Sequence, residues 1–122
     1  MKNAVVWSEI PVADLKRATA FYEKLLDGKL QSENFGPFRV AMFPHAADGV
    51  GGCLMHGNGY EPSAKGTVTY LAAQPGIDAV LERARKLGAM VLLPKTALPG
   101  EQGYIAHLMD CEGNRIGLHA MS

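Results

Sequence analysis

Apolar and polar positions along the chain follow two periods, and the same order of periods occurs twice. In the first half, residues 5–10 are rich in strand formers and predict a strand that stops at Pro11. Apolar residues at helical spacing then predict a helix that begins after Asp14, a suitable N-cap, and is closed by Gly28. Three further strands are predicted, separated by turns rich in glycine and proline, at residues 29–35, 38–43 and 50–56.

The second half repeats this order after a segment of linker composition at residues 57–66. Residues 67–73 predict a strand, Pro75 suits the first turn of a helix, and Gly88 suits its end. Strands are then predicted at residues 89–93, 104–109 and 115–120, the last two joined by a tight turn in which Gly113 and Asn114 suit positive φ. The apolar faces of the two helices keep the same spacing about sixty residues apart, which indicates an internal duplication.

Each half is too small to hold a core of its own, so the halves are expected to share one. We predict an α+β fold in a single domain, residues 1–122, with βαβββ modules at about 4–56 and 67–121. Side by side, their sheets would form a curved mixed sheet whose outer face the helices cover and whose inner face lines a cavity.

Composition excludes several classes of partner. The 122 residues include 12 Lys plus Arg and 12 Asp plus Glu, and no basic run offers a surface for nucleic acid. No stretch approaches the roughly 18 apolar residues of a membrane helix, and the N-terminus meets charge too early for a signal peptide. Two cysteines are too few for a disulfide framework, so we expect a cytoplasmic protein whose partner is a small molecule.

Two stretches of sequence carry a resemblance to a known family. One runs from Glu9 to Ala18 and is followed by the pair Phe21-Tyr22; the other runs from Gly103 through the turn at 110–114 to Leu118. Together with the duplicated order of elements, they resemble the vicinal oxygen chelate superfamily, which includes glyoxalase I, extradiol dioxygenases, and fosfomycin and bleomycin resistance proteins. The likeness is closest to small bacterial glyoxalase-like proteins. It implies the fold and a homodimer, but such motifs do not specify a reaction.

The resemblance also implies where a metal would bind. Metal-dependent members hold a divalent cation with side chains that are typically His or Gln and Glu. The matching positions here are Trp7, Thr67, Gly117 and, within about one residue, Cys53. None offers an imidazole or a carboxylate, so we expect no metal or other cofactor, and no glyoxalase I chemistry by the family's usual route.

Glu9 is the candidate catalytic residue. It shares a strand face with Trp7, and the resemblance directs that face into the cavity. The alternative is a carboxylate that holds strands together through a buried ion pair or a hydrogen bond. Trp7 offers a flat surface to a planar ligand, or fills the volume of the absent metal. Cys53 is a candidate nucleophile or, as we favour, inert apolar filling.

Two histidines also have a functional and a structural interpretation. His119 shares the strand face of Gly117 and would point into the cavity, or lie exposed near the chain end. His107 lies in an apolar strand, where a satisfied core histidine is the commoner case. A displaced site made of His107, His119 and Glu9 would suit Fe²⁺ or Zn²⁺ chemically, and we keep it as a minor alternative.

Two features of the second half concern exposed parts of the chain. Cys111 lies in the tight turn, where exposure would open it to oxidation. Residues 93–103 form the longest interruption between predicted strands, and they predict either a mobile lid or a loop stiffened by its prolines.

The leading hypothesis is a metal-free, glyoxalase-like protein that binds a small, partly apolar molecule in a β-lined cavity. Ligand contacts are expected from the first, fourth and fifth strands and from the last hairpin: Trp7, Glu9, Cys53, Met55, Thr67, Thr69, and His107 or His119. One alternative is a lyase, isomerase or dioxygenase of the glyoxalase type that uses a displaced metal site or Glu9 alone. Another is a regulatory or structural dimer without a ligand.

Overall fold

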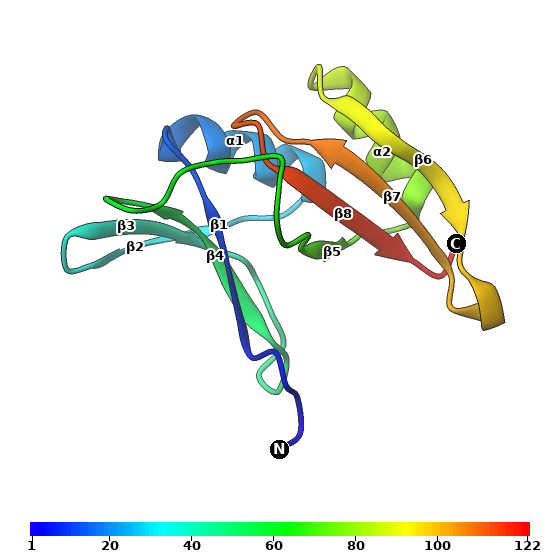
Figure 1. Cartoon of the computed structure of the whole chain (residues 1–122), viewed down its shortest axis with the longest axis horizontal. Helices are drawn as coiled ribbons and strands as arrows, with labels where there is room; N and C mark the ends of the chain where they lie inside the picture. Colours follow the sequence, from blue (N-terminus) through cyan, green and yellow to red (C-terminus); the bar gives the residue numbers. More distant parts are fainter.

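Each half of the chain folds into one strand, one helix and three further strands (Figure 1). The computed structural model describes all residues, 1–122. The first module comprises β1 (Trp7–Pro11), α1 (Leu15–Leu26), β2 (Gln31–Phe35), β3 (Phe38–Met42) and β4 (Gly51–His56). The second comprises β5 (Tyr70–Ala72), α2 (Ile77–Lys86), β6 (Met90–Ala97), the short 3₁₀ helix η1 (Pro99–Glu101), β7 (Tyr104–Met109) and β8 (Arg115–Ala120). The predicted α+β fold of two βαβββ modules is confirmed.

The strands form two four-stranded sheets with matching topology, β1-β4-β3-β2 and β5-β8-β7-β6. The β1–β4 and β5–β8 pairs are parallel, and the other pairs are antiparallel. No strand ladder joins β1 to β5, and β5 pairs only with β8, over three residues. The modules instead meet there through the Ser8 and Thr69 hydroxyl groups, which share a hydrogen bond of 3.0 Å. The expected curved sheet is therefore interrupted at this seam.

Helix α1 begins where the sequence predicts, but a different residue caps its C-terminal end. The Asp14 side chain caps the helix by accepting a hydrogen bond from the backbone N–H of Arg17. At the other end Asp27, rather than Gly28, takes the left-handed conformation, with φ of 53°. The backbone N–H of Gly28 then donates to the carbonyl oxygen of Glu23, which closes the last turn.

Helix α2 starts later than predicted. Pro75 follows a cis peptide bond ahead of the helix, and Gly76 is the N-cap, so the proline is not in the first turn. The end is as expected, because Gly88 follows the helix with a φ of 78° that favours glycine. In the β7–β8 turn Gly113 also has positive φ, at 91°, whereas Asn114 does not.

Strand boundaries agree best in the last hairpin, where β7 and β8 match the predicted ranges. β6 runs on to Ala97, so the predicted interruption at 93–103 shrinks to residues 98–103. Pro94 is tolerated within β6 because this strand lies at the edge of its sheet. The first strand omits the exposed residues 5–6, and the fifth retains only Tyr70–Ala72 of the predicted 67–73.

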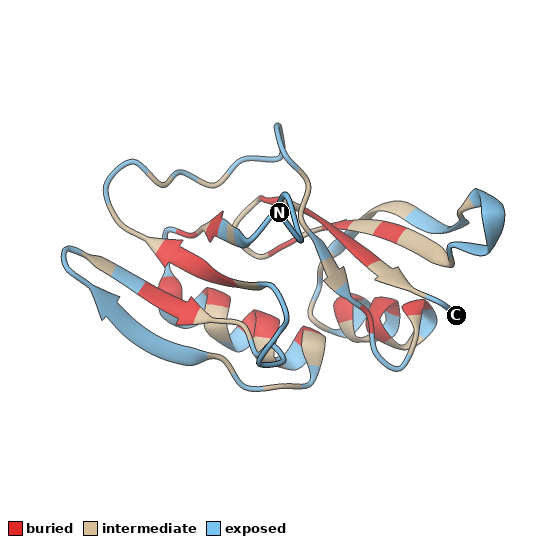
Figure 2. Cartoon of the chain, turned by 90° about the horizontal axis from the view of Figure 1, so that it is seen from below, coloured by how far each residue is buried: buried red, intermediate tan, exposed pale blue.

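A single hydrophobic core joins the two modules. Its 18 buried residues come from both helices and from the helix-facing sides of both sheets. Buried positions therefore follow the inner sides of the helices and the central strands, whereas β2 is exposed throughout (Figure 2). A second cluster of Val40, Cys53 and Met55 lies on the opposite face of the first sheet, because these positions alternate with the core residues Ala41 and Leu54.

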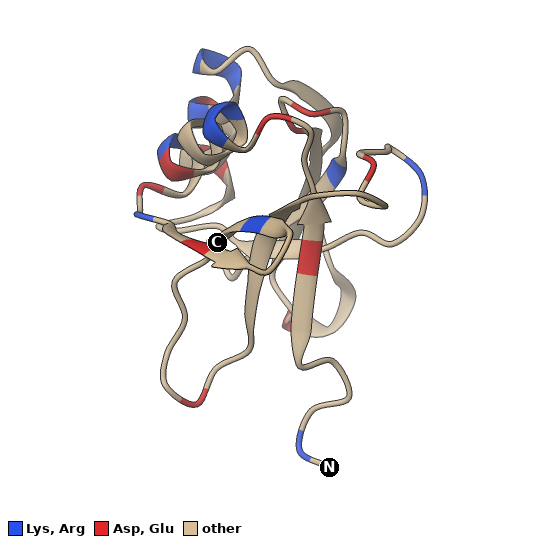
Figure 3. Ribbon diagram, turned by 90° about the vertical axis from the view of Figure 1, so that its left-hand side faces the viewer, with Lys and Arg blue, Asp and Glu red and all other residues tan.

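Charge is distributed as the zero net charge suggests. Acidic and basic residues are mixed along the helices and connecting loops, and the strands carry few of either (Figure 3). Neither helix is long and apolar enough to cross a lipid bilayer.

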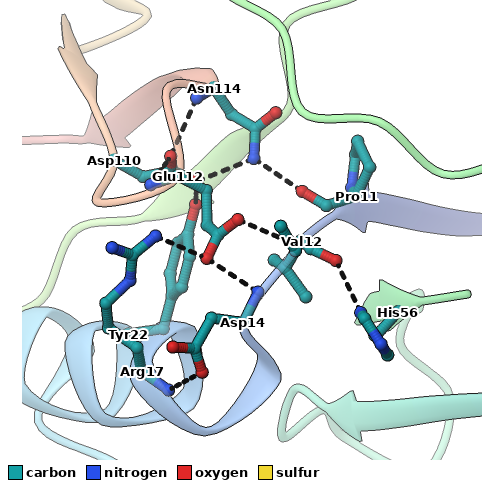
Figure 4. A network of polar contacts seen from close by, with 10 residues as sticks. Pro11, Val12, Asp14, Arg17, Tyr22, His56, Asp110, Glu112 and Asn114 are labelled. Carbon is teal, nitrogen blue, oxygen red and sulfur yellow. Dashed lines mark hydrogen bonds and ion pairs between the residues drawn. The ribbon is translucent and has the colours of Figure 1, made fainter.

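A polar network that we call the clasp consists of Tyr22, Asp110, Glu112 and Asn114, and it ties the β7–β8 turn to the first module (Figure 4). The Asn114 amide donates to the Pro11 carbonyl oxygen at 2.8 Å and to the Asp110 carboxylate at 3.0 Å. Its Oδ1 accepts from the backbone N–H of Ser63 at 3.0 Å. Tyr22 donates from its hydroxyl group to the same Asp110 carboxylate.

Glu112 completes the clasp at the start of α1. Its carboxylate accepts hydrogen bonds from the backbone N–H groups of Ala13 and Asp14 and from the Arg17 guanidinium at 2.9 Å. Burial acts to raise the pKa of Glu112, but these donors together hold it below its usual value of 4.5. Most of the residues that carry the family resemblance around this turn therefore serve packing and connection between modules.

Candidate functional site

A cleft runs along the seam where β1 faces the segment that leads into β5. Its larger part has a volume of about 850 Å³ and takes side chains from both modules. A smaller part of about 220 Å³ lies where the linker and the start of β8 approach β1. Both parts share Glu9, Thr67 and Thr69, and we call the whole the seam cleft. The larger volume falls within the range of about 300–1,000 Å³ typical of small-molecule sites.

Strand alternation places two predicted site residues at this cleft. Ile10 points into the core, so its neighbour Glu9, together with Trp7, lies on the opposite face of β1. The Trp7 ring packs against Gly51, where an added Cβ would lie 2.9 Å from the ring and 3.1 Å from the His45 ring. Glycine at this position therefore makes room for the indole at the cleft wall.

Glu9 is an exposed carboxylate held by two aromatic donors. Trp7 Nε1 donates to one oxygen at 3.3 Å, and the Tyr60 hydroxyl donates to the other at 2.8 Å. The hydrogen bond to Glu9 raises the pKa of Tyr60 above its ordinary value. No Lys, Arg or His forms an ion pair with this carboxylate, so the alternative of a buried ion pair is wrong. The alternative of a structural hydrogen bond stays open, since Tyr60 ties Glu9 to the linker. The fixed carboxylate can accept further hydrogen bonds from a ligand.

Thr67 and Thr69 lie at the opposite side of the seam, just before β5 begins. The Thr69 hydroxyl bonds to Ser8, and its carbonyl oxygen accepts from the backbone N–H of Gly117 at 2.9 Å. Both threonines line the two parts of the cleft, so the expectation that they and β1 share one cavity fits this geometry.

Cys53 and Met55 do not line the seam cleft. They are 0% and 3% exposed and pack with Val40 in the second hydrophobic cluster. Burial, with a smaller contribution from the charge of Glu9, raises the pKa of the Cys53 thiol to about 11. Since the thiolate is the nucleophile, this residue has the properties of apolar filling.

Cys111 is less exposed than the sequence predicts. It is only partly exposed, and burial together with the nearby Asp110 carboxylate raises its pKa to about 11. The prediction that Cys111 is exposed and readily oxidised is therefore wrong, because the clasp packs this turn against α1.

His107 and His119 lie on the second sheet and do not line the cleft themselves. His107 is not a core residue, because the buried positions on either side of it, Ala106 and Leu108, point the other way. Its ring bonds to Tyr70 and to Arg115. His119 Nε2 lies 2.7 Å from the carbonyl oxygen of Gln102 and so contacts the loop after β6.

The displaced metal site made of Glu9, His107 and His119 is not formed. Nowhere in the molecule do three side chains of His, Cys, Asp or Glu converge in a way that could hold a metal ion.

The positions that correspond to the family's metal ligands do not fit a metal either. Thr67, expected at one of these positions, lies ahead of β5, and the β5 residue that pairs with Gly117 is Tyr70. A Cβ on Gly117 would lie 2.5 Å from the Tyr70 ring, so this ring covers the place where a ligand side chain would begin. The Trp7 ring covers Gly51 in the same way. An indole and a glycine supply no donor for a divalent cation.

Sequence reasoning missed Tyr60, Tyr70 and Arg115. Tyr70 alternates with Leu71, a partly buried residue against the core, which is a readable signal that it faces outward. Arg115 and His107 meet only because β7 and β8 pair in a particular register, and no pattern within either strand shows this.

Two βαβββ modules with a common core and a ligand-sized cleft at their seam define a class of duplicated α+β proteins. This chain belongs to the Glyoxalase/Bleomycin resistance protein/Dioxygenase superfamily, whose family model matches residues 4–118. The resemblance expected from the sequence is thereby confirmed. A search of curated protein sequences gave no match.

Solved structures with the same fold cover almost the whole chain. A glyoxalase/bleomycin resistance protein from Streptomyces sp. CB03234 is 21% identical, with a TM-score of 0.75 over 96% of this chain and 100% of that one. TnmS3, an antibiotic binding protein from the same organism, is 22% identical, with a TM-score of 0.74 over 98% of this chain and 97% of that one. The fosfomycin resistance protein FosX from Listeria monocytogenes is 21% identical, with a TM-score of 0.70 over 98% and 92%. At these identities the likeness shows the fold.

Proposed function

We propose that this protein binds a small, partly apolar molecule in the seam cleft and does so without a metal. The observation that carries the proposal is the cleft of about 850 Å³ between the modules. Its walls combine aromatic and aliphatic side chains with a few polar groups, which is the usual composition of a small-molecule site. A metal is not part of the proposal because the residues at the corresponding positions offer no suitable donor set.

Exposed apolar surface is concentrated at this cleft. The chain leaves nine large hydrophobic side chains exposed, and four of them line the larger part of the cleft: Val5, Trp7, Val50 and Tyr70. Exposed apolar groups that gather in one place mark a binding surface more often than scattered ones do. A ligand in the cleft would remove them from water.

Each module contributes one exposed aromatic ring to the cleft. Trp7 is 39% exposed and Tyr70 is 45% exposed, so both rings have free surface for contact with a planar ligand. Glu9 is placed to accept a hydrogen bond from the ligand, and Thr67 and Thr69 offer hydroxyl groups that can donate or accept. These five residues are the proposed contacts.

The structural neighbours support the class of ligand only in general terms. TnmS3 is described as an antibiotic binding protein, and FosX as a fosfomycin resistance protein. Both descriptions involve small molecules, and both proteins have the fold of this chain.

We also propose a homodimer in solution, which the family resemblance implies and which size-exclusion chromatography with light scattering tests.

Thermal unfolding against a library of small planar molecules tests the proposal. A ligand that binds only the folded protein raises Tm in proportion to RT ln(1 + [L]/Kd). The variant Ala72→Trp places an indole in part of the cleft from an exposed position of β5, so it should weaken the response. Ala47→Trp adds the same side chain at an exposed loop position outside the cleft and should keep it. Equal responses from both variants would place the ligand elsewhere.

A further inference from the structure

Three side chains of the second module form a hydrogen-bonded row beside the seam cleft. The Tyr70 hydroxyl lies 2.5 Å from His107 Nε2, and Arg115 Nη1 lies 3.0 Å from His107 Nδ1. Tyr70 lines the larger part of the cleft and Arg115 lines the smaller part. The imidazole of His107 therefore links two of the polar groups that the second module presents to the ligand space.

The chemistry of the row fixes the direction of its hydrogen bonds. A guanidinium group can only donate, so Nδ1 of His107 must accept from Arg115. A neutral imidazole then carries its proton on Nε2 and donates it to the Tyr70 oxygen. Burial and the charge of Arg115 lower the pKa of His107, which favours this neutral form. The hydroxyl proton of Tyr70 is consequently left free to donate.

Arg115 has donors to spare. The ion pairs of this protein involve Arg17, Arg85 and Lys95, and Arg115 takes part in none of them. Only one of its five N–H groups is engaged by a side chain, that of His107. A half-buried cation without a carboxylate partner is a natural binding group for an anion. The other charged residues around the smaller part of the cleft are Glu9, Glu61 and Lys65.

The Tyr70 ring is also held in position. Gly117 lies beneath it, and the ring meets the His107 ring edge-on with centroids 5.3 Å apart. A donor fixed in this way loses little rotational freedom when a ligand accepts its hydrogen bond.

We infer that the row of Tyr70, His107 and Arg115 binds an acidic oxygen, a phenolate or carboxylate, of a planar aromatic ligand. The Tyr70 hydroxyl donates to this oxygen, and Arg115 balances its charge. His107 acts as a positioning residue that holds the Tyr70 oxygen as an acceptor and so directs the hydroxyl proton outward. This inference rests on the proposed function, since it assigns the acidic end of a ligand held in the same cleft.

Quenching of Trp7 fluorescence tests the inference with two matched probes. Trp7 is the only tryptophan and lines the cleft. The probes are para-nitrophenol, ionised at pH 8, and nitrobenzene, which has no acidic oxygen. A hydrogen bond to a charged group predicts binding of the phenolate at least about tenfold tighter than nitrobenzene. Tyr70→Phe and Arg115→Gln should each remove most of this preference and leave nitrobenzene affinity within about twofold.

His107→Phe should abolish the preference while nitrobenzene still binds, which a merely structural role for the imidazole would not produce. Arg39→Gln, an exposed arginine outside the cleft, should change neither affinity. Equal affinity of wild type for both probes, or a preference that survives in Tyr70→Phe and Arg115→Gln, overturns the inference and leaves the proposed function standing. Saturable binding of neither probe counts against both.

Discussion

The clasp predicts that Asn114, a side chain at the edge of the smaller part of the cleft, has a large effect on stability. Asn114→Ala removes the amide that joins the β7–β8 turn to Pro11, Asp110 and Ser63. Asn114 is only 5% exposed, so water cannot easily replace the lost partners. The variant leaves a carbonyl oxygen at the end of β1 and a backbone N–H in the linker without their side-chain partner, which costs more than the loss of exposed hydrogen bonds.

The expected loss follows from this count. Three side-chain hydrogen bonds at about 1 kcal/mol each give a loss of about 3 kcal/mol in the free energy of unfolding. The two backbone groups left without a partner increase this loss. In a domain of 122 residues this corresponds to a decrease in Tm of roughly 10 °C.

Urea unfolding followed by far-UV circular dichroism and by Trp7 fluorescence measures the effect. The two signals should change together, because one core joins both modules and the transition is expected to be cooperative. Asn58→Ala, an exposed asparagine in the linker with no side-chain hydrogen bond, is the matched control and should change the free energy of unfolding by less than about 0.5 kcal/mol. A loss below about 1 kcal/mol for Asn114→Ala would refute the reasoning that the clasp holds the modules together.

Three further predictions use other parts of the fold. Because the folded-state pKa of Glu112 lies below its usual value of 4.5, its contribution to stability is complete above that value and is lost as the pH falls through the folded-state pKa. The stability advantage of wild type over Glu112→Gln should therefore be full at pH 7 and vanish in acid, and a difference independent of pH would contradict this origin. An added Cβ at Gly52 would lie 2.7 Å from a backbone oxygen of β1, so Gly52→Ala should destabilise by about 1–3 kcal/mol in urea unfolding. Gly28→Ala meets nothing within 4 Å and is the control. The pKa values of about 11 for Cys53 and Cys111, against the ordinary 9.0, predict about a hundredfold less thiolate at pH 8 than in the unfolded chain. Iodoacetamide should therefore modify both thiols far more slowly in the native protein than in the unfolded chain. Equal rates in native and urea-unfolded protein would contradict the burial of these thiols.

Local patterns in the sequence predicted the parts of the fold that depend on local chemistry. The cap at Asp14 and the end of α2 at Gly88 follow from the conformational preferences of those residues, and both are confirmed. The start of α2 was missed because a proline ahead of a helix and one in its first turn look the same in sequence. The extension of β6 was missed because Pro94 suggested a loop, whereas an edge strand accepts a proline.

The candidate site could be predicted only where strand alternation was sufficient. Trp7 and Glu9 share a strand, so their common face was readable from the sequence. The burial of Cys53 depends on how the whole sheet packs. The row of Tyr70, His107 and Arg115 depends on the register of three separate strands, and register comes from pairing between segments distant in the chain.

The most direct test of the central claim is a titration with a neutral naphthylamine dye whose fluorescence rises in apolar surroundings. The seam cleft predicts saturable binding with one site per chain in wild type and in Ala47→Trp. The same dye should bind more weakly to Ala72→Trp, in which the added indole occupies part of the cleft. Fluorescence that never saturates, or that is equal in Ala72→Trp and wild type, would contradict a ligand site at the seam between the modules.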